Sequence, residues 1–226
     1  MQVKTWGQGF GPAADLLVGA DQGTNTRPRR PAFGTNTLVM SSRFDILDTP
    51  LERLKLIQRK PIGDQRGYLE RMFCAEELQT LLSGKSIAQI NHTLTARRGT
   101  VRGLHFQYPP HAETKVVSCL RGAVFDVAVD LRQGSPTFLR WHAEILSAEN
   151  HKTLVIPEGF AHGFQTLTDD CELLYFHTAA WQPSAEGALN AQDPGIDIHW
   201  PEAVTELSPR DAAHPLVAKD LVGLAV

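Results

Sequence analysis

The 226-residue chain contains no apolar run that approaches the roughly 20 residues of a membrane-spanning helix. It also has no excess of positive charge, since 22 Lys and Arg residues stand against 25 Asp and Glu residues and the formal net charge is −3. This balance argues against nucleic acid or an anionic membrane as a partner. No series of basic, apolar and small residues marks a secretion signal, so we expect a cytoplasmic protein.

Cysteine is scarce as well, and its three positions, Cys74, Cys119 and Cys171, are widely spaced along the chain. An odd number of distant cysteines fits neither a disulfide framework nor a zinc knuckle. We therefore predict three reduced thiols whose roles are structural.

Helical periodicity is nearly absent after residue 87, where the pattern is almost all strand and turn. Strands are predicted over residues 54–59, 116–120, 124–130, 141–146, 153–156 and 172–178. Their spacing of about 8–14 residues, with turn residues between them, predicts a barrel or jelly roll. One amphipathic stretch, residues 76–82, is predicted to form a short helix that ends near Gly84.

The first 43 residues differ in composition from the remainder of the chain. Residues 21–37 are rich in Gly, Asn, Thr, Arg and Pro and have little apolar surface to bury. We predict that residues 1–43 form a disordered or loosely attached extension and that residues 44–226 form one domain. An arm that crosses to a partner subunit is the functional alternative for the extension.

Two segments place a histidine within an alternating strand pattern: residues 102–107 contain His105, and residues 156–164 contain His162. On neighbouring strands of one small barrel, these imidazoles would face each other across the lumen. Such a lumen is where an all-β protein can perform acid–base chemistry on a small molecule. Nearby, Asp126 is predicted to be an acid in the pocket or directly behind its lining, and Asp130 is predicted to pair with Arg132 at a turn.

Several motifs follow one another in a characteristic order. They are Asp-Gln-Arg-Gly at 64–67, Gln-Ile-Asn at 89–91, Arg-Gly-Leu-His-Phe-Gln at 102–107, Asp-Val-Ala-Val-Asp-Leu-Arg at 126–132, Ile-Pro-Glu-Gly-Phe-Ala-His-Gly-Phe at 156–164 and Leu-Ser-Pro-Arg-Asp at 207–211. Through this ordered set, which falls within residues 55–215, the chain resembles the dTDP-4-dehydrorhamnose 3,5-epimerases.

The resemblance implies an all-β fold, namely a cupin-type double-stranded β-helix (jelly-roll barrel) with a few short helices. It implies an isomerase that inverts C3 and/or C5 of a nucleotide-linked 4-keto-6-deoxy sugar, dTDP-4-dehydro-6-deoxy-D-glucose, by proton abstraction and reprotonation through an enolate. Such enzymes serve deoxysugar and surface-polysaccharide biosynthesis. The resemblance also implies a homodimer with strands exchanged between subunits, and no cofactor or metal.

Matching the family position by position implies catalytic roles for four residues. His105 corresponds to the general base and Asp211 to its carboxylate partner, while Lys115 corresponds to a lysine near the keto oxygen. Tyr175 corresponds to a tyrosine acid. The residue types suit these roles, because a neutral imidazole is basic near neutral pH, a fixed ammonium stabilises an enolate, and a phenol can return a proton to carbon.

The resemblance further implies a set of substrate contacts. They fall on Arg66, Gln89, Asn91, Arg102, His162, Trp181, Glu186 and Arg210. Arg66 and Arg102 offer forked donors for a diphosphate. Three positions depart from the family pattern: Arg71 replaces a common glutamate, Trp181 replaces a tyrosine that stacks on thymine, and Ser118 replaces a common arginine. An indole provides a larger stacking surface than a phenol.

Three alternative functions remain open at this point. A metal-dependent cupin would use His105, His111, Glu113 and His162 as ligands. Gln107, a poor ligand, stands where a His-x-His pair would place its second histidine. A non-catalytic sugar-nucleotide binding module would not need the acid–base set. A mono-epimerase or ketoisomerase acting on a similar sugar nucleotide would keep that set.

Overall fold

The computed structural model describes residues 42–218 and 220–226. The predicted extension over residues 1–43 therefore lies almost wholly outside the described part. Its last two residues contact the domain, since the Ser42 hydroxyl and the Arg43 amide each donate to the Glu77 carboxylate at 3.0 Å. Among the described residues, every helix is too short to reach across a bilayer.

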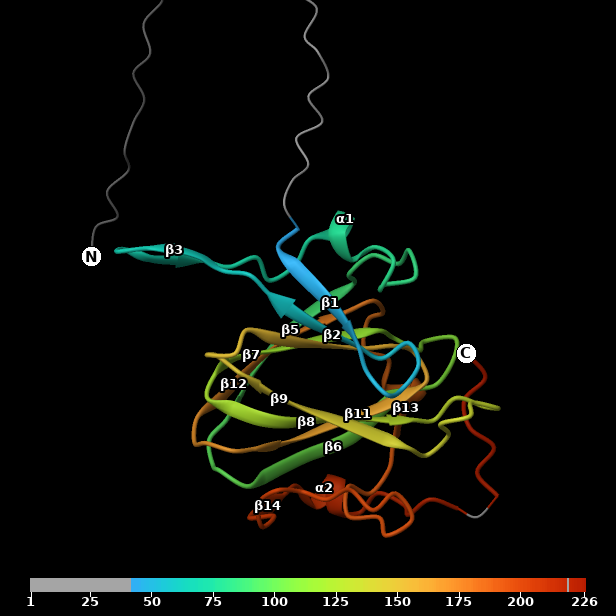
Figure 1. Cartoon of the computed structure of the whole chain (residues 1–226). Helices are drawn as coiled ribbons and strands as arrows, with labels where there is room; N and C mark the ends of the chain where they lie inside the picture. Colours follow the sequence, from blue (N-terminus) through green and yellow to red (C-terminus); the bar gives the residue numbers. More distant parts are fainter. Residues whose placement is uncertain (1–41, 219) are drawn as a thin grey trace, which may run out of the picture. The chain divides into compact units, whose positions relative to one another are not determined.

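Two facing sheets make up the domain (Figure 1). The first has the order β1–β2–β10–β7–β12–β5, with bounds Phe44–Asp48, Lys55–Arg59, Lys152–Ile156, Lys115–Arg121, Cys171–His177 and Gln89–Thr95. The second has the order β13–β6–β11–β8–β9, with bounds Glu186–Ala188, Thr100–Gln107, Phe160–Thr166, Ala123–Asp130 and Trp141–Ser147. A short strand, β14 (Glu206–Leu207), pairs with β6 in parallel. The predicted all-β jelly roll is confirmed, and each predicted strand lies within one residue of its observed bounds.

The inner core lies between the sheets and follows the period of two along each strand. In β12, Cys171, Leu173 and Tyr175 point into this core. The intervening Leu174 and Phe176 pack on the outer face instead. The strands β7 and β8 alternate in the same way. Alternate side chains of both sheets therefore share one interior.

The outer face of the first sheet packs against α1 (Ala75–Leu78) and the turns that follow it, through Leu78 and Leu82. The helix is shorter than the predicted span of residues 76–82, because the chain continues in turns as far as Gly84. Beyond Leu78 the spacing of the amide hydrogen bonds is irregular: Leu81 bonds to Leu78 at 3.0 Å, three residues back, and Gly84 bonds to Gln79 at 3.1 Å, five residues back. A helix this short gains little from propensity, so packing holds it in place.

Two local predictions are confirmed. Asp130 is fully buried and accepts from Arg132 at 2.8 Å and from Ser135 and Thr137 at 2.6 Å each. Burial opposes ionisation of this carboxyl, but its hydrogen bonds outweigh burial and lower the pKa of Asp130 to about 2. The three cysteines are free thiols.

An irregularity in β6 brings Arg102 and His105 to the same interior. Gly103, with a φ of +129°, lies against Gly163, and a Cβ built on Gly103 would stand 2.6 Å from the Gly163 Cα. The pairing register between β6 and β11 shifts opposite this point. On a regular strand, residues three apart point to opposite faces. The irregularity removes that constraint, and Arg102 and His105 line one cavity.

The hairpin of β3 (Ile62–Asp64) and β4 (Gly67–Leu69) projects away from the two sheets (Figure 1). In the described part of the chain it pairs with no further strand. Ile62, Tyr68 and Leu69 are exposed by 46%, 64% and 74%. An isolated two-stranded hairpin is marginally stable in water, and clustered apolar side chains on a surface mark a contact region.

We predict that Gly103→Ala destabilises the domain more than Gly134→Ala does. Both glycines have positive φ angles, +129° and +73°, but nothing lies within 4 Å of a Cβ built on Gly134. The free energy of unfolding should fall by about 1 kcal/mol for Gly134→Ala and by at least about 3 kcal/mol for Gly103→Ala, where a backbone clash adds to the strain. Urea unfolding measures both losses, and equal losses would contradict the close approach of β6 and β11.

Candidate active site

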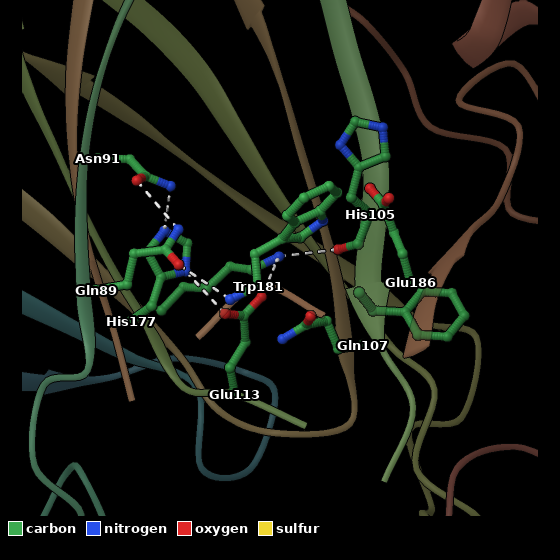
Figure 2. A pocket seen from close by; sticks show the side chains of 10 residues that line it. Gln89, Asn91, His105, Gln107, Glu113, His177, Trp181 and Glu186 are labelled. Carbon is green, nitrogen blue, oxygen red and sulfur yellow. Dashed lines mark hydrogen bonds and ion pairs between the residues drawn. The ribbon is translucent and has the colours of Figure 1, made fainter. Parts of the chain in front are cut away.

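One end of the space between the sheets is polar, and two adjoining cavities lie there. The larger, of about 420 Å³, and the smaller, of about 210 Å³, share Asn91, His105, Lys115 and His177 in their walls. Figure 2 shows the side chains around the larger cavity. Because strands of both sheets supply these walls, the site lies where the two sheets face each other.

His105 on β6 pairs directly with His162 on β11, which confirms that the two histidines lie on neighbouring strands. They lie side by side and do not face each other across the lumen as expected. The reason is that β6 and β11 belong to the same sheet, so paired residues point in the same direction. Both imidazoles reach the smaller cavity.

Asp211 holds the ring of His105. The His105 Nε2 lies 2.8 Å from Asp211 Oδ1, and the Gly103 amide donates to the other carboxylate oxygen at 3.4 Å. Asp211 belongs to α2 (Pro209–Ala212), where the Ser208 side chain accepts from the Asp211 amide. Burial opposes its ionisation, but the hydrogen bond and charge of His105 outweigh burial and lower the pKa of Asp211. The ionised carboxylate therefore fixes the proton of a neutral His105 on Nε2 and leaves Nδ1 as the basic atom.

Lys115 bridges the two sheets. It lies on β7, in the first sheet, and its Nζ donates at 3.1 Å to the backbone carbonyl of His105, in the second sheet. The same nitrogen lies 3.3 Å from Glu113 Oε1. Since an ammonium group has three N–H donors, one remains for a ligand in the cavity.

Tyr175 enters the smaller cavity from β12, in the sheet opposite His105. Its ring lies edge-on to that of His162, with the centroids 6.0 Å apart. His162 in turn lies 2.9 Å from Asp126, which is fully buried, so Asp126 is an acid beside the pocket as predicted. Burial, followed by the negative charge of Asp126, raises the pKa of Tyr175, so this phenol keeps its proton at neutral pH.

Most of the predicted substrate contacts surround the same cavities. The larger cavity is lined by Gln89, Asn91, Trp181 and Glu186. Arg102 lines the smaller one. Glu186 forms an ion pair with Arg210, which borders a third cavity together with His105. The structure thus brings every predicted site residue except Arg66 to one region.

Arg66 lies at the turn of the projecting β3–β4 hairpin. Its side chain is 90% exposed and forms an ion pair with Asp64. The depression at this hairpin is lined by residues 62–69 alone. Within a single chain, Arg66 therefore does not reach the cavity that contains His105.

Two further titratable residues, His177 and Glu113, line the larger cavity although the sequence did not assign them to the substrate site. His177 continues the inward row of β12 two residues beyond Tyr175, and its Nδ1 lies 2.9 Å from Glu113 Oε2. The period of two that places Tyr175 inward would also have identified His177. Glu113 is predicted from the sequence only as a ligand in the metal-dependent alternative.

The ligand set of the metal-dependent alternative is not assembled. Among residues 42–218 and 220–226, the group with the spacing of a metal site is His105, Asp211 and His214. His111 is exposed, and Glu113 and His162 are each bonded to another side chain. The predicted set of four ligands therefore does not surround one point.

Comparisons with known proteins identify the family of this chain. The family model described as dTDP-4-dehydrorhamnose 3,5-epimerase matches residues 48–219. A dTDP-4-dehydrorhamnose 3,5-epimerase of Sinorhizobium fredii is 43% identical over 166 residues, which cover 73% of this chain and 85% of that protein. One from Salmonella typhimurium is 41% identical over 179 residues, which cover 78% of this chain and 97% of that protein.

Solved structures give the same result. A dTDP-6-deoxy-D-glucose-3,5-epimerase from Legionella pneumophila, in complex with dTDP-4-keto-L-rhamnose, has a TM-score of 0.74 at 39% identity and covers 81% of this chain and 99% of that chain. ChmJ, a 3′-monoepimerase from Streptomyces bikiniensis in complex with dTDP-quinovose, has a TM-score of 0.68 at 32% identity and covers 75% and 86%. The chain therefore belongs to the dTDP-4-dehydrorhamnose 3,5-epimerase family, whose members are isomerases with this jelly-roll fold.

Proposed function

We propose that this chain inverts C3 and C5 of dTDP-4-dehydro-6-deoxy-D-glucose by proton transfer, in deoxysugar biosynthesis. The observation that carries the proposal is the placement of His105 and Tyr175, which enter one cavity from opposite sheets. Inversion at carbon needs a base on one face of the sugar ring and an acid on the other. The two sheets supply one group each.

The substrate's C4 ketone makes the hydrogens on C3 and C5 acidic. In the proposed first step, His105 Nδ1 takes one of these protons, and the C–H electron pair becomes the C=C bond of an enolate whose charge lies on O4. The new proton makes His105 an imidazolium. Asp211, ionised and 2.8 Å from the other ring nitrogen, stabilises that charge.

Lys115 is the proposed partner of the enolate oxygen. Two of its donors are directed to the His105 carbonyl and Glu113, which fixes the ammonium in place before substrate arrives. A preorganised donor of this kind contributes about 3–4 kcal/mol to transition-state stabilisation when it meets developing charge.

Tyr175 is the proposed acid. Its O–H proton passes to the carbon on the face opposite His105, the C=C bond becomes a C–C single bond, and the carbonyl reforms. The phenolate then recovers a proton from solvent, and the His105 imidazolium releases the abstracted proton to solvent, so both groups return to their starting states. Because its pKa is raised, the group is protonated before each turnover.

The remaining residues of the site support a sugar nucleotide as the ligand. Arg102 can pair with a phosphate through its forked guanidinium, and the exposed Trp181 ring can stack on the base. The Legionella relative is described with dTDP-4-keto-L-rhamnose bound. Inversion of C3 alone is the second candidate, because the similar structure from Streptomyces bikiniensis is described as a 3′-monoepimerase.

We also propose that the enzyme is a homodimer in which the β3–β4 hairpin carries Arg66 to the partner's cavity. Two observations support this arrangement: the hairpin exposes three large apolar side chains, and Arg66 is remote from the cavity of its own chain. In a two-fold dimer, the exchange is reciprocal, so each site gains one arginine.

His105→Ala should slow solvent deuterium exchange into C3 and C5 by about 10²–10⁴-fold, because the variant lacks the base. Nucleotide binding should persist. Proton NMR of dTDP-4-dehydro-6-deoxy-D-glucose in heavy water measures the exchange, and His199→Ala, which alters an exposed histidine paired with Asp197, is the matched control. Undiminished exchange in His105→Ala would remove His105 from the base role.

Tyr175→Phe should retain solvent exchange at C3 and C5 but epimerise poorly, since abstraction survives and delivery to the opposite face does not. The measurement compares the rate of deuterium entry with the rate at which the L-configured product accumulates. An equal loss of both rates would mean that Tyr175 positions the substrate and is not the acid.

A mixed dimer of one His105→Ala subunit and one Arg66→Ala subunit should recover about half of the wild-type activity, although each variant alone is nearly inactive. One of its two sites then combines an intact His105 with an intact Arg66 from the other chain. Dual affinity tags isolate the mixed dimer for assay. No recovery would show that Arg66 does not serve the site of the partner subunit.

A further inference from the structure

A row of hydrogen bonds runs along one wall of the larger cavity (Figure 2). The Trp181 amide donates to Gln89 Oε1 at 3.0 Å, and Gln89 Nε2 donates to Asn91 Oδ1 at 3.1 Å. Asn91 Nδ2 lies 3.3 Å from His177 Nε2. The other nitrogen of that ring, Nδ1, lies 2.9 Å from Glu113 Oε2. The row therefore ends at a carboxylate.

Every bond in this row has the same direction. The amide nitrogen of Asn91 only donates, so Nε2 of His177 accepts, and the ring proton of the neutral imidazole lies on Nδ1 and is donated to Glu113. Burial opposes ionisation of Glu113, but the hydrogen bond of His177 and the charge of Lys115 outweigh burial and lower its pKa. An ionised Glu113 thus fixes the direction of the whole row.

The direction of the row decides what the cavity wall offers to a ligand. Gln89 and Asn91 each direct the side-chain oxygen to a protein donor and keep a second N–H that no side chain among the described residues takes up. The wall consequently presents donors, which suit an anionic ligand rich in acceptors.

We propose that Glu113 and His177 are positioning residues that set the amide orientation of Asn91 and Gln89, and thereby make this wall select the diphosphate of a sugar nucleotide. The inference rests on the proposed function, because that function supplies the ligand. It adds two residues and a direction of hydrogen bonding that the acid–base chemistry does not require.

Protonation of His177 would reverse the arrangement. An imidazolium donates from both nitrogens, so Asn91 would have to turn its oxygen toward the ring and its NH₂ toward Gln89. Gln89 would then turn its own oxygen toward Asn91 and its NH₂ toward the Trp181 amide, where two donors would meet. Gln107 holds the flanking peptide independently, through the Ala180 carbonyl and the Gln182 amide. The loop therefore keeps its fold while the free N–H of each amide changes its position on the wall.

Titratable and charged groups from each neighbouring element surround the His177 ring. Glu113 and Lys115 lie on the side of the first sheet, Tyr175 stacks on the ring at 5.9 Å, and His105 and Glu186 line the same cavity from the second sheet. Histidine is the side chain whose charge changes near neutral pH. His105 is present in every variant below, so its contribution cancels in the comparison.

The test is calorimetric binding of dTDP-glucose between pH 5.5 and pH 7.5. This probe has no ketone to react, and its diphosphate, esterified at both ends, keeps its charge over the range. Wild-type affinity should fall at least about tenfold toward pH 5.5, which corresponds to about 1.4 kcal/mol. His177→Gln, which can accept from Asn91 and donate to Glu113, should bind with near wild-type affinity at pH 7.5 and lose the pH dependence. His177→Leu should bind at least about tenfold more weakly at pH 7.5.

His92→Gln is the matched control, because His92 also pairs with a glutamate, Glu172, but is 52% exposed on the outer face of β5. It should keep the wild-type pH dependence. If His177→Gln keeps that dependence too, the inference is overturned while the proposed function stands. If the wild type does not bind dTDP-glucose at pH 7.5, the proposed function itself is overturned. Thermal unfolding of each variant separates weak binding from loss of fold.

Discussion

The hydrogen bond between His105 and Asp211 joins residues 106 positions apart, and the site depends on it. Asp211 reaches the ring because β14 pairs with β6 and because Ser208 caps the helical turn that contains Asp211. The buried carboxylate decides which ring nitrogen is basic. A segment that adds only a two-residue strand to the second sheet therefore determines the chemistry available in the cavity.

The same strands line both the hydrophobic core and the site, because the interior between the sheets is apolar at one end and polar at the other. At one end, apolar residues such as Leu154 and Leu173 are fully buried. At the other end, charged groups are buried with partners: Lys115 with Glu113, and His162 with Asp126. An unpaired buried polar group costs about 1–3 kcal/mol, so these pairs make a polar end compatible with a folded barrel.

The sequence predicts a large part of this arrangement for a physical reason. Alternation with a period of two is a local property, and it places Lys115 on the inward face with Val117 and Cys119 as expected. Family motifs then identify Asp211, which no local pattern could pair with His105. Nine of the twelve residues named in advance for the site line the two adjoining cavities, and Arg210 and Asp211 line the third cavity beside them.

What the sequence does not predict depends on contacts between distant segments. Strand order is not a local property, so His105 and His162 were expected to face each other and instead lie side by side. The direction of the hydrogen bonds through His177 depends on Glu113, which lies in a separate loop. The residue pattern of β12 alone therefore does not predict this direction. The sequence also does not predict that Arg66 lies exposed on the β3–β4 hairpin, away from the cavity of its own chain.

The protonation of His105 tests the account most directly. Nitrogen-15 NMR of histidine-labelled enzyme at pH 7.5 reports which ring nitrogen carries the proton. We predict a protonated Nε2, directed to Asp211, and an unprotonated Nδ1 that is free to take a proton from carbon. A resting enzyme with the proton on Nδ1 would contradict it, because the base would then have no lone pair on the atom that remains for the substrate.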